Sequence, residues 1–213
     1  MNKIDVNVNA QLENNKTAAK NRDFFKKNNL FVLNIISSPG SGKTSILELM
    51  AEKLKDKLCV ITGDIQTTID ADRITKAGSQ AIQIETGGSC HLTAFMIEKH
   101  LSNLELSDCR FLVIENIGNL VCPATYDLGE NIKVAVISTT EGDEKPVKYP
   151  SLFTRAHAVI INKIDLLPYV NFNIERIERD CYKLNNSAKI FKLSCKTKQG
   201  FAEWLLYLES LLT

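Results

Sequence analysis

The sequence predicts an α/β fold with a mostly parallel sheet of about seven strands and helices on both faces. Short, almost uninterrupted apolar runs recur along the chain, and helix-compatible stretches separate several of them. Strands that are apolar at nearly every position are buried on both faces, as they are in sheets covered by helices. A phosphate-binding loop directly after the first run, between a strand and a helix, identifies the fold as that of a P-loop NTPase.

The expected strands and helices follow one another from residue 31 onward. The strands are Phe31–Ile36, Leu58–Thr62, Ala81–Ile84, Phe111–Ile114, Lys133–Ile137, Ala158–Ile161 and Ile190–Leu193. The helices are Thr44–Leu54, Thr67–Ala77, His91–Leu101, Ile174–Leu184 and Phe201–Leu212. Ligands bind such sheets at the carboxyl ends of the strands, and the motifs described below all lie there.

The segment before the first strand is polar and helix-compatible from about residue 11 to residue 27. We expect it to form an N-terminal helix. Ahead of it, Ile4–Val8 alternates apolar and polar residues, which suits either a short edge strand or an unstructured tail.

Composition narrows the possible functions. The chain has 213 residues, of which 44% are hydrophobic and 24% charged, and its formal net charge is +1. This balance argues against a dedicated nucleic-acid surface, which needs clustered positive charge. No apolar run approaches the roughly 20 residues that span a bilayer, and the polar residues 1–30 contain no signal peptide. We expect a cytoplasmic protein with no membrane partner, in which the six cysteines are reduced.

The phosphate-binding loop spans Ser37–Thr44. Its glycines let successive backbone N–H groups point into one concavity, and the helix that follows adds a favourable field for phosphate. We expect Lys43 to reach the β- and γ-phosphates and the Thr44 hydroxyl to ligate Mg²⁺. The expected phosphate-binding residues are Gly40, Ser41, Gly42, Lys43, Thr44 and Ser45. Ser37 stands where the general pattern has its first glycine, so a Gly/Ser turn with a chance lysine is the alternative.

A guanine-reading tetrad, Asn162-Lys163-Ile164-Asp165, follows the sixth apolar run. The Asp165 carboxylate can accept hydrogen bonds from guanine N1–H and from the 2-amino group, neither of which adenine offers. We expect Asn162 to brace the phosphate loop or accept from the base, and the Lys163 stem to pack on the ring. Downstream, Ser194-Cys195-Lys196 resembles the Ser-Ala-Lys loop that closes over guanine in GTPases.

Two carboxylates are candidates for holding Mg²⁺ together with Thr44. Glu115 begins Glu-Asn-Ile-Gly at the end of the fourth run, where many GTPases have Asp-x-x-Gly. Asp64 ends the second strand and is either a Mg²⁺ or water-positioning residue or a turn residue. With Lys43 these are the predicted catalytic residues. No glutamine stands where small signalling GTPases orient the attacking water, so slow hydrolysis is expected.

Cys90, His91 and Cys122 form a candidate site for Ni²⁺ or Zn²⁺, since both metals bind thiolate and imidazole. The predicted helix start at His91 would lower the pKa of Cys90 and favour the thiolate. Both segments leave carboxyl ends of strands, on the side of the nucleotide, and Cys122 shares a loop with Glu115. Spacing alone leaves open that these are three unrelated residues.

At this point the chain resembles the HypB family, the GTPases that help insert nickel into [NiFe] hydrogenase. The matching stretches are Ser37–Thr44, Gly63–Thr67, Asp70–Ile74, Cys90–Leu92, Glu115–Pro123, Glu141–Pro146 and Asn162–Pro168. Family members also read Ser-Ser-Pro-Gly in the phosphate loop, so Ser37 fits the pattern.

The resemblance implies a nucleotide-dependent homodimer in which Cys90, His91 and Cys122 bind Ni²⁺ or Zn²⁺ near the dimer interface. It also implies a HypA-type maturation partner and the hydrogenase large subunit as partners. The predicted organisation is an N-terminal arm and helix, residues 1–30, and a single P-loop GTPase domain with an embedded metal site, residues 31–213.

We therefore interpret the chain as a GTP-gated metallochaperone with GTP, Mg²⁺ and Ni²⁺ or Zn²⁺ as its ligands. Lys145 or Lys148 is a candidate to reach across the dimer to the nucleotide, the alternative being a solvated charged loop. A P-loop small-molecule kinase would prefer ATP, and a metal-binding interaction protein would not need hydrolysis. A urease-type nickel GTPase would carry Cys-x-His, which does not occur here.

Overall fold

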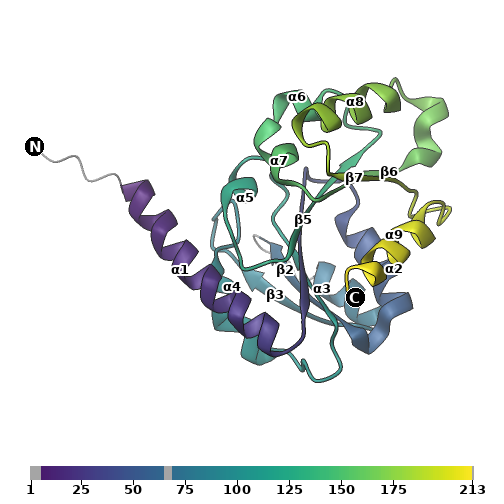
Figure 1. The fold of residues 1–213 in the computed structure, drawn as a ribbon. Helices are drawn as coiled ribbons and strands as arrows, with labels where there is room; N and C mark the ends of the chain where they lie inside the picture. The colour runs from purple at the N-terminus through teal and green to yellow at the C-terminus, as the bar shows by residue number, and fades with distance from the viewer. Residues whose placement is uncertain (1–5, 65–68, 213) are drawn as a thin grey trace, which may run out of the picture.

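The protein is described by a computed structural model covering residues 6–64 and 69–212, with side chains from residue 9 onward. In this part of the chain seven parallel strands form one sheet in the order β3-β2-β4-β1-β5-β6-β7 (Figure 1). The strands are β1 (Phe31–Ser37), β2 (Leu58–Asp64), β3 (Gln80–Glu85), β4 (Phe111–Glu115), β5 (Ile132–Ser138), β6 (Ala158–Asn162) and β7 (Lys189–Lys192). Every expected strand is confirmed, and the expected mostly parallel sheet with helices on both faces is correct.

The helices of the described chain include all those expected and several short ones. They are α1 (Val6–Lys27), α2 (Lys43–Leu54), α3 (Ile69–Lys76), α4 (Ala94–His100), α5 (Cys122–Thr125), α6 (Lys145–Lys148), α7 (Pro150–Arg155), α8 (Ile174–Leu184) and α9 (Phe201–Ser210), with 3₁₀ turns η1 (Lys55–Lys57), η2 (Leu101–Asn103) and η3 (Ile164–Tyr169). The unexpected α5, α6 and α7 each carry a proline in the first turn, where its fixed φ suits a helix start. Among the described helices, none is both long enough and apolar enough to cross a membrane.

Helices cover the two faces of the sheet in separate groups (Figure 1). The helices α2, α3 and α9 pack on one face, and α1, α4, α5, α7 and α8 pack on the other. On β1, Leu33 and Ile35 join the first core, whereas Val32 and Ile36 face the second side. Alternate residues of a strand point to opposite faces, so a strand buried on both faces needs apolar residues at successive positions.

Two expectations about where helices begin are wrong, and parts of two others fall on residues that the structure does not describe. The helix α1 starts at Val6, so the edge-strand interpretation is wrong for Val6–Val8. Once a helix is nucleated, each added residue gains a backbone hydrogen bond, whereas a short isolated strand gains none. The helix expected from His91 starts at Ala94, because the Thr93 hydroxyl caps it by accepting from Met96 N at 3.3 Å. Residues 4–5 and 67–68 lie outside the described residues.

The first helix is joined to the rest of the chain by buried polar side chains. Asn21 is buried, and its Nδ2 donates to Ala94 O at 2.9 Å and to Leu128 O at 3.2 Å. Gly129 passes so close to this helix that a Cβ there would lie 2.7 Å from Ala18 O. Phe25, near the end of α1, belongs to the core that α4 also covers. The helix α1 therefore fixes the start of α4 and the loop that precedes β5.

Candidate functional site

The phosphate loop joins the end of β1 to the start of α2. Gly40 and Gly42 have φ of 74° and 97°, in the left-handed region that glycine adopts readily. A Cβ at Gly42 would collide with the Asn162 side chain. Asn162 Nδ2 donates to Ser41 O at 2.9 Å, and Lys163 Nζ donates to Gly40 O at 2.7 Å. The end of β6 thus braces the loop through Asn162, as expected. The Lys163 ammonium also bonds to the loop, at Gly40 O.

The ammonium of Lys43 lies inside the curve of this loop. It donates to Ser37 Oγ at 2.7 Å, and burial lowers its pKa. The serine that departs from the general pattern therefore supplies a hydrogen-bond acceptor for the lysine. A buried, partly desolvated ammonium is a strong partner for an entering anion, because the attraction is less screened than in water.

A cavity of 740 Å³ lies beside the loop, between α2, α3 and the ends of β6 and β7. Its lining includes Gly42, Ser45, Asn162, Lys163, Asp165, Cys195 and Lys196. Asp165 Oδ1 accepts a hydrogen bond from Ser194 Oγ at 2.5 Å, so the loop after β7 orients this carboxylate. The Cys195 thiol donates to Asn162 Oδ1 at 3.6 Å and so links the loop after β7 to the end of β6. The structure brings together every residue that the sequence assigned to base recognition.

A second cavity of 580 Å³ adjoins the first and contains the phosphate loop and both candidate carboxylates, Asp64 and Glu115. Glu115 Oε1 accepts from Thr44 Oγ1 at 3.0 Å. Its Oε2 is buried and has no hydrogen-bond partner in the described chain. Burial raises the pKa of Glu115 to about 7. An unsatisfied carboxylate oxygen beside a hydroxyl is a suitable site for a hard cation such as Mg²⁺, which prefers oxygen ligands.

The end of β4 also approaches the phosphate loop closely. A Cβ at Gly118 would lie 3.0 Å from Pro39 Cγ and 3.1 Å from Pro39 N. A side chain at position 118 would therefore press on Pro39, and the phosphate loop would have to shift by a few tenths of an ångström. The arrangement agrees with the expected Glu-x-x-Gly segment, whose two ends both reach the phosphate cavity.

Cys90, His91 and Cys122 converge, with their ligand atoms all within 4.8 Å of one another. They come from two loops, one after β3 and one after β4 that ends at α5. His91 Nδ1 lies 3.4 Å from Cys90 Sγ, and His91 Nε2 is buried without a hydrogen-bond partner in the described residues. Burial lowers the pKa of His91, which favours the neutral imidazole that binds metals. Two thiols and an imidazole suit Zn²⁺ or Ni²⁺.

The expectation that a helix N-terminus lowers the Cys90 pKa is wrong. Because α4 starts at Ala94, Cys90 lies before its first turn. The neighbouring Cys122 thiol instead raises the pKa of Cys90, and burial adds to this effect. A metal that binds Cys90 must therefore displace a thiol proton.

Several residues that sequence analysis did not identify support these loops. The Tyr126 ring lies against the His91 ring, with centroids 3.9 Å apart. Asn119 Nδ2 donates to Cys90 O at 3.4 Å, which links the two ligand loops. From α1, Asn14 accepts from Ala94 N at 2.9 Å and donates to the Asp127 carbonyl at 2.8 Å. These partners are distant in sequence and follow no local pattern.

The two lysines considered for a reach across a dimer differ in their surroundings. Lys145 Nζ donates to Ser38 Oγ at 3.1 Å and lies 3.4 Å from Glu141, so it already borders the phosphate loop of its own chain. Lys148 is exposed and pairs with Glu144 at 2.7 Å. Of the two, Lys145 is the one that contacts the phosphate loop.

Comparison with known proteins gives consistent results. A family model described as "CobW/HypB/UreG, nucleotide-binding domain" matches residues 31–192. The hydrogenase maturation factor HypB of Escherichia coli is 46% identical over 209 residues, which are 97% of this chain and 72% of that protein. The hydrogenase/urease maturation factor HypB of Helicobacter pylori is 43% identical over 216 residues, covering 98% of this chain and 88% of its own. A crystal structure of HypB from Helicobacter pylori in complex with nickel has a TM-score of 0.91 at 43% identity and covers 94% of this chain and 95% of that one.

The buried Glu115 carboxyl predicts a pH-dependent stability. Its pKa rises from an ordinary 4.5 to about 7 on folding, so between these pH values the folded protein holds a proton that the unfolded chain has lost. The free energy of unfolding of the metal-free protein therefore falls as pH rises through this window. Urea denaturation at pH 5 and pH 8 should show that the wild type loses about 1–3 kcal/mol relative to Glu115→Gln. Parallel pH profiles for the two proteins would show that Glu115 does not titrate in this way.

Proposed function

Because the chain belongs to the CobW/HypB/UreG family of nucleotide-binding proteins, and within it to the HypB hydrogenase maturation factors, we propose that it is a GTP-hydrolysing metallochaperone that assists nickel insertion into [NiFe] hydrogenase. The observation that carries this proposal is the placement of two sites at one edge of the sheet. The phosphate loop and base cavity lie beside a Cys-His-Cys cluster, and one segment, from Glu115 to Cys122, borders both.

In this proposal GTP occupies the two adjoining cavities, with the base in the larger one. Asp165 accepts hydrogen bonds from guanine N1–H and the 2-amino group, while Ser194 keeps its carboxylate oriented. Adenine would leave this carboxylate without its two donors, which is a strong basis for rejection. Asn162 and Lys163 hold the phosphate loop in place beneath the ribose and phosphates.

The phosphates lie in the smaller cavity, where Lys43 exchanges the Ser37 hydroxyl for phosphate oxygens. Thr44, Glu115 and Asp64 would hold Mg²⁺, whose charge would stabilise the negative charge that develops on the transferred phosphoryl group. Lys145, at the rim beside Ser38, adds a second positive charge to the same chain's phosphate site.

Hydrolysis is proposed to be slow because the residue after Gly118, Asn119, makes hydrogen bonds to the loops of the metal site and does not orient water. Asn119 stands at the position where small signalling GTPases have their water-orienting glutamine. Its Nδ2 donates to Cys90 O and its Oδ1 accepts from Val121 N at 2.8 Å, so it holds the metal-binding loops. In this proposal Asp64 is the residue that positions the attacking water. Slow turnover is suited to a protein that acts as a switch.

Nickel, as the cargo, binds the Cys90 and Cys122 thiolates and the His91 imidazole, with Zn²⁺ as the alternative ion. Two large apolar side chains close in sequence to the ligands, Phe95 and Val121, are 62% and 59% exposed. Exposed apolar side chains on the segments that carry the ligands support a homodimer whose two-fold axis places the two metal sites face to face. We propose that GTP favours this dimer and thereby changes the affinity for metal or partner.

The proposed setting is the cytoplasm, with a HypA-type protein and the hydrogenase large subunit as partners. A second candidate function is assistance to another nickel enzyme, since the Helicobacter pylori relative is named as a hydrogenase/urease maturation factor. A P-loop small-molecule kinase is not supported, because the base cavity contains the Asp165 carboxylate oriented by Ser194.

Native mass spectrometry tests nucleotide-gated metal binding. We expect the protein with Ni²⁺ and a non-hydrolysable GTP analogue to form a dimer that carries metal, and the GDP form to be mainly monomeric. Cys122→Ala should lose the metal, because one of three converging ligands is removed, whereas Cys181→Ala, which removes a buried thiol on α8, should keep it. Metal retained in Cys122→Ala, or no metal in the wild type, would reject this site.

Base specificity tests the nucleotide assignment. Asp165→Asn removes the carboxylate that pairs with guanine, so affinity for GTP should fall at least about 100-fold, while affinity for xanthosine triphosphate should rise. Isothermal titration with GTP, ATP and xanthosine triphosphate measures the three affinities. Glu175→Gln, an exposed change on α8, should alter none of them. Equal binding of ATP and GTP by the wild type would favour the kinase alternative.

A further inference from the structure

Adjacent residues at the end of β4 point to opposite sides of the sheet. Phe111 and Val113 face the core under α2, whereas Leu112 and Ile114 face the core under α4. Continuing this alternation, Glu115 turns toward Thr44 of the phosphate site. The next residue, Asn116, follows the strand, is 1% exposed and lines the phosphate cavity. Its side chain also accepts a hydrogen bond from Leu92 N, in the loop that carries Cys90 and His91.

Asn116 holds the backbone of the residue that follows the ligand His91. Its Oδ1 accepts hydrogen bonds from Leu92 N and from Ile117 N, both at 3.1 Å. Leu92 is fully buried, and a Cβ on Gly63 would lie 2.8 Å from its Cδ1. Leu92 is therefore fixed by the end of β4 through its backbone and by the end of β2 through its side chain. These are the two strand ends that carry Glu115 and Asp64.

The other end of the Asn116 carboxamide begins a second buried connection. Its Nδ2 donates to Asn34 Oδ1 at 3.2 Å, and Asn34 Nδ2 donates to Glu130 Oε1 at 3.2 Å. Both asparagines are almost completely buried, and Glu130 is 9% exposed. Buried polar groups are costly unless paired, and here the donors and acceptors of both carboxamides are used.

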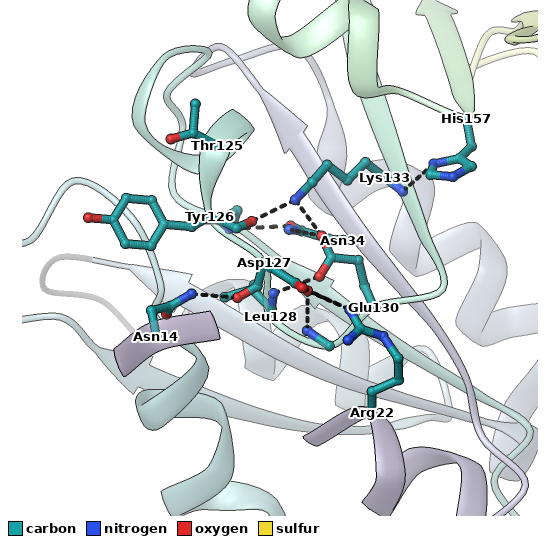
Figure 2. A network of polar contacts seen from close by, with 12 residues as sticks. Asn14, Arg22, Asn34, Thr125, Tyr126, Asp127, Leu128, Glu130, Lys133 and His157 are labelled. Carbon is teal, nitrogen blue, oxygen red and sulfur yellow. Dashed lines mark hydrogen bonds and ion pairs between the residues drawn. The ribbon is translucent and has the colours of Figure 1, made fainter. Parts of the chain in front are cut away.

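This connection continues to the ring that covers His91. Figure 2 shows the Lys133 ammonium between the Glu130 carboxylate and the Tyr126 carbonyl, and its hydrogen bond to Tyr126 O is 2.6 Å long. The same tyrosine places its ring 3.9 Å from the His91 ring. Leu128 N also donates to Glu130 Oε2 at 2.7 Å, which fixes the loop between Tyr126 and β5.

We propose that Asn116 is a positioning residue that couples the phosphate site to the Cys90-His91-Cys122 site, and that Asn34, Glu130, Lys133 and Tyr126 form the second arm of this coupling. The proposal deepens the proposed function and rests on it. Both arms start at Asn116 and end at His91, one through Leu92 and the other through Tyr126. Glu115 and Asn116 are consecutive and both line the phosphate cavity, so a backbone shift at the end of β4 when Mg²⁺ and GTP bind would be transmitted to the Asn116 carboxamide. The position of His91 then changes with the nucleotide.

The test measures the ratio of Ni²⁺ dissociation constants with GDP and with a non-hydrolysable GTP analogue. In the wild type we expect this ratio to differ from one by at least about fivefold, and Ni²⁺ must change the affinity for the analogue by the same factor. In Asn116→Ala the ratio should approach one, although both metal and nucleotide still bind. Asn34→Ala removes the second arm alone and should reduce the ratio partially. Asn185→Ala, whose carboxamide donates to Ala156 O at 2.9 Å far from both sites, should leave it unchanged.

The outcomes separate this inference from the proposed function. If the wild type binds no Ni²⁺ or no GTP, the proposed function fails. If the wild type shows the ratio and Asn116→Ala shows the same ratio, the inference is overturned while the function stands. Should Asn116→Ala fail to fold, Tyr126→Leu decides, because it removes the ring against His91 without breaking a side-chain hydrogen bond in the described chain. An unchanged ratio in Tyr126→Leu would then overturn the inference.

Discussion

The peptide unit that joins Glu115 to Asn116 determines how the two candidate sites are related. Glu115, the last residue of β4, contacts Thr44, while Asn116, which follows it, contacts the backbone of Leu92 in the loop that carries Cys90 and His91. In the proposed coupling, this single peptide unit links the two candidate sites. The contacts from Asn116 through Leu92 and through Tyr126 extend the link to the candidate ligand His91.

The parallel sheet supplies the second requirement, because all its strands end at the same edge. The strand order places β4 next to β1 and β2 next to β4, so Asp64 and Glu115 lie at strand ends that line the cavity beside the phosphate loop. The loops after β3 and β4 carry the thiols. The two sites differ in chemistry. Oxygen ligands beside the phosphate loop suit Mg²⁺, whereas two thiols and an imidazole suit Ni²⁺ or Zn²⁺. Each ion can thus be selected although the sites are neighbours.

The features that sequence predicted are those with a local signal. Continuous apolar runs identify buried strands, and glycines between a strand and a helix identify the phosphate loop. The places of Cys90 and Cys122 after strand ends put both on one side of the sheet, but spacing left open that they were unrelated, and only the family resemblance implied a shared site. The helix α4 starts three residues after the expected His91, because the Thr93 side chain caps it and several residues in this segment could have served as the start. The contact between Asn34 and Asn116 joins residues 82 positions apart, and no periodicity predicts such a pair.

A crystal structure of the protein with Mg²⁺, a non-hydrolysable GTP analogue and Ni²⁺ tests the account most directly, with anomalous diffraction at the nickel edge locating the ion. The account predicts guanine at Asp165, Mg²⁺ between Thr44 and Glu115, and one nickel peak per chain at Cys90, His91 and Cys122. A nickel peak elsewhere, or a nucleotide whose base lies away from Asp165, would contradict the claim that one strand edge holds both sites.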